Sequence, residues 1–384
     1  MKLDLTPEQA FFAGTTRQFL DDKVPTSLLR ELRSDPAGFG RDFWRQGADL
    51  GWTSLLVPEA DGGGSVSGQG LSDLALVAFE FGRYAAPGPL TAANLVTAAV
   101  ARTGTAQQKA GLLPSLMTGD QIGSWAYAEP RPFERLGAVG LRATREDGRY
   151  VLSGHKAPVE AASQADLFLV TALLVAEGDE DGGLIQFLVP AGTPGVSVHP
   201  MRTLDVTRRF GHVVFDDAPV PASAVLGEPG TAEADVERQL RIAVVIQLAE
   251  MSGAMDRGLE LTTEWLFNRY SFGRPLASYQ ALKHRFADMR VWLEAAHAMA
   301  DAAAQHVQEE SGQAGEYVSA GKSFLGTYAL EVLQECVQFH GGIGVTFEHD
   351  LHLYLRRATV DAQLYGTVAD HRERLTAILE ATDG

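Results

Sequence analysis

A short turn between two long helical patterns constrains the fold of this chain more than any other feature. Residues 233–267 contain no proline, and residues 278–310 contain neither glycine nor proline. Runs of this length predict two helices of roughly eight to ten turns each. The octet between them, Arg269 to Leu276, reads Arg-Tyr-Ser-Phe-Gly-Arg-Pro-Leu. We therefore expect two long helices joined by a tight turn that carries a positive charge on each side.

The two arginines of the octet suit an anionic ligand. Guanidinium groups bind phosphate through paired N–H donors, so Arg269 and Arg274 are candidates for contact with a phosphate-bearing molecule. The octet alone favours the simpler interpretation that both side chains are solvated. The formal net charge of −17 argues against nucleic acid or an anionic membrane as a partner, but it does not exclude a local cationic site.

The pattern of the chain changes twice and predicts three domains. Residues 1–120 show helical spacing that begins at Thr6-Pro7-Glu8, a capping residue followed by a first-turn proline and an acid. Residues 121–228 alternate short β-type runs with turns, including a hairpin signal at Asp147-Gly148, and predict a small barrel or sandwich. Residues 229–384 are helical again. Within them, residues 242–255 are apolar on nearly every side, as in a helix at the centre of a bundle.

Cysteine content and the chain start predict a cellular location. Cys336 is the single cysteine, so no intrachain disulfide can form and a reducing compartment is expected. Residues 1–7 lack a secretory apolar core, and no run of about 18 apolar residues occurs. We therefore expect a cytoplasmic protein with no membrane partner.

Common catalytic and metal-binding motifs are absent from the sequence. No Walker loop occurs, and no Gly-x-Gly-x-x-Gly follows a strand and opens a helix, so a Rossmann nucleotide site is unsupported. His349 and His352 lack the carboxylate that completes a common metal-binding pattern, and no metal is expected. No nucleophile elbow accompanies the scattered serine, histidine and aspartate residues.

Several blocks along the chain together resemble the acyl-CoA dehydrogenase family from end to end. The octet, with Asn268 before it and Gln280 after it, is similar to the family's most specific block. The Ala-Glu-Pro at residues 128–130 resembles the family's Thr-Glu-Pro strand, and Gly154-His155-Lys156 resembles its Gly-x-Lys. The remaining matching blocks are residues 50–64, 80–89 and 338–344.

The resemblance implies an α+β multidomain fold with FAD at the interface between subunits. The expected parts are an N-terminal helical domain, a middle β-barrel and a C-terminal four-helix bundle. Arg269 would pair with the FAD pyrophosphate of a neighbouring subunit. The other cofactor positions implied are Ser271, Phe272 and Gln280 along the FAD, Gln338, Gly341 and Gly342 at its adenine end, and Tyr127, Ala128 and Glu129 beside the isoalloxazine ring.

The catalytic base implied by the resemblance is missing from both of its usual positions. The family removes an α-proton from an acyl thioester with a glutamate while the β-hydride goes to the flavin. The usual Tyr-Glu-Gly-Thr motif reads Tyr-Gly-Thr here, which puts Gly366 at the glutamate position. The alternative position on the first bundle helix is Ala243. Glu250, two helical turns further on, is a candidate base, although a structural role is the favoured interpretation.

Three functions are compatible with these motifs. The first is FAD-dependent α,β-dehydrogenation of an acyl thioester, bound to CoA or a carrier protein, with a displaced base. The second is a catalytically silent, FAD-holding subunit of a heteromeric acyl-CoA dehydrogenase, since the tail at residues 347–357 resembles the subgroup that forms α2β2 assemblies. The third is a flavin monooxygenase on the same fold. The chain would accordingly form a homo-oligomer or a heterotetramer with a related subunit.

Overall fold

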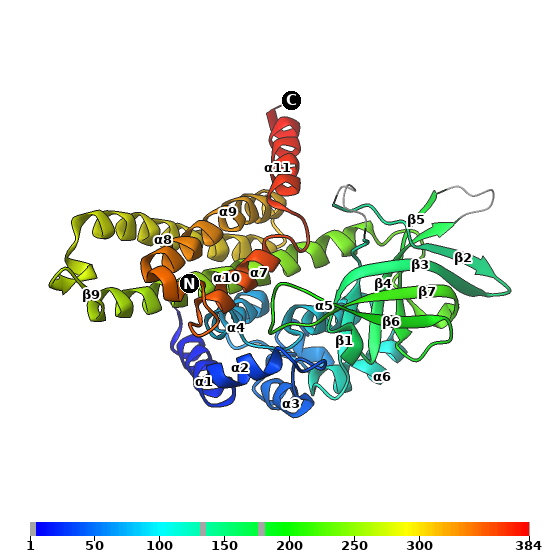
Figure 1. Cartoon of the computed structure of the whole chain (residues 1–384). Coiled ribbons are helices and arrows are strands. Elements are labelled where there is room, and N and C mark those ends of the chain that lie inside the picture. Colours follow the sequence, from blue (N-terminus) through cyan, green and yellow to red (C-terminus); the bar gives the residue numbers. More distant parts are fainter. Residues whose placement is uncertain (1–4, 131–135, 176–180, 384) are drawn as a thin grey trace.

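The computed structural model describes residues 5–130, 136–175 and 181–383. The chain is elongated, with a β-sheet at one end and the turn between two long helices at the other (Figure 1). Within the described residues, no helix is both long enough and apolar enough to cross a membrane.

Helices form the N-terminal part of the chain, as predicted. The first helix begins where expected: the Thr6 hydroxyl accepts a hydrogen bond from the Gln9 backbone N–H, and the Gln9 side chain accepts one from the Thr6 N–H. This reciprocal pair is a capping box, which satisfies two backbone donors at the helix start. The helices are α1 (Pro7–Lys23), α2 (Thr26–Leu32), α3 (Arg41–Asp49), α4 (Gly70–Tyr84), α5 (Leu90–Thr103) and α6 (Ala106–Met117).

Strands form the middle part, and the predicted hairpin is confirmed. Asp147 and Gly148 both have positive φ, +47° and +78°, which matches the twist of the two strands that they join. The strands are β1 (Gly123–Ala126), β2 (Arg142–Glu146), β3 (Arg149–Glu160), β4 (Leu167–Val175), β5 (Asp181–Pro190), β6 (Val196–Met201), β7 (Phe210–Pro221) and β8 (Val225–Leu226).

The predicted middle β domain is confirmed, but in the described residues its strands form an open sheet and not a closed barrel. The strands pair in the order β6-β7-β3-β2-β4-β5-β8, and β1 lies parallel to β4. The sheet stays open because β8 has only two residues and the chain then leaves the sheet for the next helix. The result is a mixed sheet in which β1 and β2 pair with successive halves of one edge of β4.

The C-terminal part is helical and is built around its first helix. The elements are α7 (Glu233–Asn268), α8 (Gln280–Gln308), α9 (Ala314–His340), α10 (Leu351–Asp361) and α11 (Val368–Asp383), with a two-residue hairpin, β9 (Tyr270–Ser271) and β10 (Arg274–Pro275), in the octet. A Cβ on Gly82 of α4 would lie 1.9 Å from the Glu250 carbonyl oxygen of α7. Backbone contact this close explains why α4 and α7 pack so tightly. The domain boundaries at residues 120 and 228 stay predictions.

Candidate functional site

The end of the bundle brings together two predicted groups of cofactor residues. We call residues 265–280 and 338–344 the bundle tip. The ring of Trp265 connects its two segments: the Arg269 guanidinium lies 5.8 Å from the ring centre, and His340 stacks on the same ring at 5.1 Å. The predicted residues at this tip are Arg269, Ser271, Phe272, Gln280, Gln338, Gly341 and Gly342.

The bundle tip is open to a ligand or a partner chain. The side chain of Phe272 is 96% exposed, and a Cβ added to Gly341 or Gly342 would meet no atom within 4 Å. Further large apolar side chains are exposed beside it: Phe267, Tyr270, Ile343 and Val345. A guanidinium next to unobstructed backbone fits the pyrophosphate of a dinucleotide. An exposed apolar patch of this kind is typical of a protein–protein interface.

The third predicted group, Tyr127 to Glu129, lies at a separate cavity of about 300 Å³. Its opposite wall is residues 363–366, which follow α10. The Glu129 carboxylate accepts hydrogen bonds from Lys156 Nζ and from the Gly140 and Leu141 N–H groups, each at 2.8 Å. The Glu129 carboxylate therefore has a structural role, and the groups available to a ligand at this position are those of the backbone.

Lys156 fixes the backbone of this cavity. Its Nζ donates to the Tyr127 carbonyl oxygen at 3.0 Å as well as to Glu129. Burial lowers the pKa of Lys156 to about 8, although the Glu129 carboxylate opposes that shift. The Gly-x-Lys motif thus has a structural role here, because the lysine ties β3 to the residues after β1.

Three aromatic rings support one side of the same cavity. Trp125 stacks on Tyr127 with ring centres 4.6 Å apart, and on Tyr365 with centres 5.7 Å apart. The Trp125 N–H donates to the Thr171 hydroxyl at 3.2 Å, which fixes the central ring. This stack joins the middle sheet to the loop after α10, so residues far apart in the sequence form one wall.

The cavity and the bundle tip lie too far apart to hold one dinucleotide within a single chain. Asp370 of α11 lines the cavity, and Arg374, one turn further along that helix, binds Glu237 in the first turns of α7 at 2.5 Å. Arg269 follows the last residue of α7, 32 positions after Glu237. At 1.5 Å per residue, the separation is about 48 Å. Figure 1 shows the β-sheet and the β9 turn at opposite ends of the chain.

A side chain at the usual glutamate position would be strained and would overlap two neighbouring side chains. Gly366 has a φ of +101°, and a Cβ there would lie 2.7 Å from His371 Nε2 and 2.8 Å from Leu136 Cδ2. His371 is fixed by the Tyr365 carbonyl oxygen at 3.0 Å and the Ser319 hydroxyl at 3.3 Å. Burial lowers the pKa of His371 to about 4, so the ring is neutral near pH 7.

Neither α7 candidate lines this cavity. Ala243 is completely buried. Glu250 is 2% exposed and belongs to a group of buried charges that we call the ionic cluster. The Arg208 guanidinium is central to it, 3.4 Å from Glu250 and 3.6 Å from Glu160. The members of the ionic cluster are Glu160, Asp205, Arg208, Glu250, Arg357 and Asp361.

The ionic cluster contains four carboxylates and two guanidinium groups. Burial raises the pKa of Glu250 to about 8, although the guanidinium of Arg208 works against that shift. Burial would also raise the pKa of Asp205, but Arg357 and then Arg208 hold it well below its usual range. Burial raises the pKa of Glu160 as well, so the cluster's excess of acids favours protonation of its two glutamates.

Sequence reasoning missed most of this cluster. A signal was present, since Arg357 and Asp361 lie one helical turn apart on α10 among apolar residues, and Glu250 interrupts the most apolar part of α7. Among the described residues, no group of three His, Cys, Asp or Glu side chains is arranged to hold a metal ion.

Replacing Gly366 by alanine is expected to destabilise the protein by about 1–3 kcal/mol, because alanine at positive φ is strained and its methyl group overlaps His371. Thermal unfolding of the purified variant measures the change. The matched control is Gly14→Ala in α1, where an added Cβ meets nothing within 4 Å, and this change should raise stability slightly. Equal melting temperatures for Gly366→Ala and the unmodified chain would contradict the prediction.

Family models match three consecutive parts of the chain. The acyl-CoA dehydrogenase N-terminal domain matches residues 6–120, its middle domain residues 124–218 and its C-terminal domain residues 232–379. The three models together cover most of the sequence.

Individual relatives agree over nearly their full length. The chain is 30% identical to the acyl-CoA dehydrogenase IpdE2 of Mycobacterium tuberculosis, over 97% of this chain and 98% of that protein. Among solved structures, butyryl-CoA dehydrogenase of Megasphaera elsdenii superimposes with a TM-score of 0.88 at 25% identity, covering 99% and 100% of the two chains. A variant of the Tcur3481-Tcur3483 steroid ACAD gives a TM-score of 0.87 at 28% identity, covering 98% and 99%. The chain therefore belongs to the acyl-CoA dehydrogenase family, whose members use FAD and act as oxidoreductases on CH–CH groups.

Proposed function

We propose that this chain takes part in FAD-dependent α,β-dehydrogenation of an acyl thioester as a subunit without its own catalytic base. FAD, when bound, supplies the acceptor for the hydride that leaves the β-carbon. The observation that carries the proposal is Gly366: the usual glutamate position has no carboxylate, its φ is +101°, and a Cβ there would overlap His371 and Leu136. We therefore place the carboxylate that removes the α-proton on another chain.

The position of Glu250 supports the same conclusion. A general base must come within hydrogen-bonding reach of the proton that it removes. Glu250 instead faces two guanidinium groups, with Arg208 Nη1 at 3.4 Å and Arg357 Nη1 at 3.7 Å, and it does not line the cavity beside Tyr127.

The residues of this chain are proposed to hold the cofactor from two sides. Arg269 and the backbone of Gly341 and Gly342 bind the pyrophosphate and adenine end of a flavin on a neighbouring subunit. Tyr127 and the residues after it offer backbone groups at their own cavity. The exposed apolar side chains at the bundle tip support a partner chain at this place.

The test compares this chain alone with this chain co-purified with a related subunit that carries the motif glutamate. Both samples are reconstituted with FAD, and butyryl-CoA and a steroid side-chain acyl-CoA are added without oxygen while flavin absorbance is recorded. We expect the absorbance to be lost only in the mixed assembly. Changing the partner's glutamate to glutamine should abolish that loss, which identifies the source of the base.

Two outcomes would overturn the proposal in different ways. Flavin reduction by an acyl-CoA in an assembly of this chain alone would assign a working base to it, with Glu250→Gln as the next variant to examine. Flavin reduction by NADH or NADPH, followed by oxygen consumption, would indicate a monooxygenase on the same fold.

A further inference from the structure

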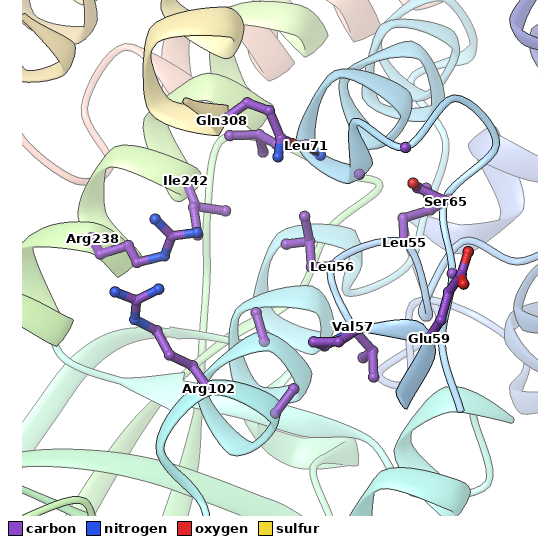
Figure 2. A pocket seen from close by; sticks show the side chains of 16 residues that line it. Leu55, Leu56, Val57, Glu59, Ser65, Leu71, Arg102, Arg238, Ile242 and Gln308 are labelled. Atoms are coloured by element: carbon purple, nitrogen blue, oxygen red, sulfur yellow. Dashed lines mark hydrogen bonds between the residues drawn. The ribbon is translucent and has the colours of Figure 1, made fainter. Parts of the chain in front are cut away.

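A second cavity, of about 380 Å³, lies between the N-terminal helices and the start of α7. None of the predicted flavin residues lines it. Its lining is mixed, and the apolar part is formed by the buried side chains of Leu55, Val57, Leu71 and Ile242 (Figure 2). Its volume is within the range of cavities that bind small molecules.

The cavity is held open by the fold itself. A Cβ on Gly70 would lie 1.9 Å from the Leu55 carbonyl oxygen, so glycine permits the close packing of two wall segments. The Asp73 carboxylate accepts hydrogen bonds from the Ser67 N–H at 2.9 Å and the Ser67 hydroxyl at 2.8 Å, which fixes the loop at the rim. The Leu71 N–H donates to the Gln308 side chain at 2.8 Å. These contacts join α4, α8 and the rim loop, so the cavity exists without a ligand.

Two arginines stand at one end of the cavity. Arg102 of α5 and Arg238 of α7 point their guanidinium groups toward each other (Figure 2). Burial and then the charge of Arg102 lower the pKa of Arg238, as expected when like charges are brought together.

The acids that balance these arginines lie outside the cavity lining. Glu310, half exposed, contacts Arg102 Nη1 at 3.0 Å and Arg238 Nη1 at 2.7 Å, and Asp235 lies 3.5 Å from Arg102 Nε. The carboxylate among the lining residues is that of Glu59, which is exposed and on the opposite side of the cavity from the arginine pair (Figure 2).

We propose that this cavity binds a small amphipathic monocarboxylate. The apolar body lies against Leu55, Val57 and Ile242, and the carboxylate binds Arg102 and Arg238 through charge-assisted hydrogen bonds. The ligand competes with Glu310 for the same guanidinium groups. A second carboxylate at the far end of the ligand would meet Glu59, so a dicarboxylate of equal length binds more weakly.

The test titrates octanoate, octanol and octanedioate into the full-length protein in a calorimeter. Octanoate should bind more tightly than both others. Arg238→Gln should weaken octanoate binding by about ten- to a hundred-fold, and Arg102→Gln should act in the same direction. Glu310→Gln should tighten it several-fold by removing the competing carboxylate. Arg145→Gln, an exposed arginine on β2, is the matched control and should leave the affinity unchanged.

The opposite effects expected for Arg238 and Glu310 separate a binding role from a structural one. A variant that only loosens the fold would weaken binding whichever partner of the pair is changed. Octanoate affinity that is unchanged by Arg238→Gln, or lowered by Glu310→Gln, would overturn the proposal. Because the titration needs no flavin and no acyl-CoA, its failure is distinct from a failure of the proposed dehydrogenase function.

Discussion

Replacing Arg357 by methionine is expected to lower the free energy of unfolding by about 3–5 kcal/mol, since removing one partner of a buried ion pair leaves the other uncompensated. Its guanidinium is completely buried and binds the Asp205 carboxylate at 2.5 Å. It also donates to the Thr207 hydroxyl at 2.6 Å and to the Ala86 carbonyl oxygen at 2.8 Å. One side chain of α10 therefore holds both the β6–β7 loop and the α4–α5 loop.

The neighbouring arginine provides a matched control for this change. Arg356 lies on the same helix, is partly exposed, and donates to the Leu204 carbonyl oxygen at 3.2 Å. Arg356→Met should cost well under half as much as Arg357→Met in thermal unfolding. Adding Asp205→Asn to Arg357→Met should recover part of the loss, because the orphaned carboxylate is then neutral. Equal costs for the two arginine variants would contradict the role assigned to the ionic cluster.

The cost of Arg357→Met should also grow with pH. The pKa of Glu250 is raised to about 8 in the folded protein, against about 4.3 for an unfolded glutamate. Its folded form therefore holds the proton more tightly, and the associated stability is complete below the unfolded pKa and lost as pH rises through 8. Removing a nearby cation raises that pKa further. The difference between variant and unmodified chain should consequently stay constant below about pH 7 and widen as pH rises through about 8.

Much of the fold could be predicted from local patterns. The capping box at Thr6, the hairpin at Asp147-Gly148 and the two helices around the octet depend on residues close together in the sequence. The closure of the sheet could not be predicted in this way. It depends on how far β8 continues beside β5, and β8 ends after two residues, before the chain enters α7.

The functional site likewise has parts that short sequence motifs predict and parts that depend on residues far apart in the sequence. Motif resemblance selected the residues that the structure gathers at the bundle tip and at the Tyr127 cavity, because those segments are short and contiguous, and their contact with FAD stays a prediction. It could identify Gly366 as a missing glutamate but not the overlap that a side chain there would meet, since His371 and Leu136 come from other segments. The ionic cluster draws on β3, the loop before β7, α7 and α10. No short stretch of sequence contains enough of it to be recognised.

Replacing Arg269 by glutamine is expected to weaken FAD binding by the assembled protein about ten- to a hundred-fold, because a charge-assisted hydrogen bond to the pyrophosphate is lost. FAD retention is measured by titration and ultrafiltration. The melting temperature of the chain alone should stay the same, since the Arg269 side chain is exposed and its guanidinium lies 5.8 Å from the centre of the Trp265 ring.

The control for Arg269 is Arg290→Gln on α8, whose partner Glu294 lies 2.7 Å away on the surface. This variant should retain FAD normally. The assembly state distinguishes two ways of losing the flavin: an unchanged molar mass with lost FAD identifies Arg269 as a cofactor contact, whereas dissociation would make it an interface residue.

The distance of about 48 Å along α7 gives a further expectation. When the Arg269→Gln chain is mixed with an unmodified related subunit, the flavin that is lost should be the one whose ring lies on that subunit. Loss of the flavin beside Tyr127 of the variant chain itself would mean that the two ends of α7 do not serve different cofactors.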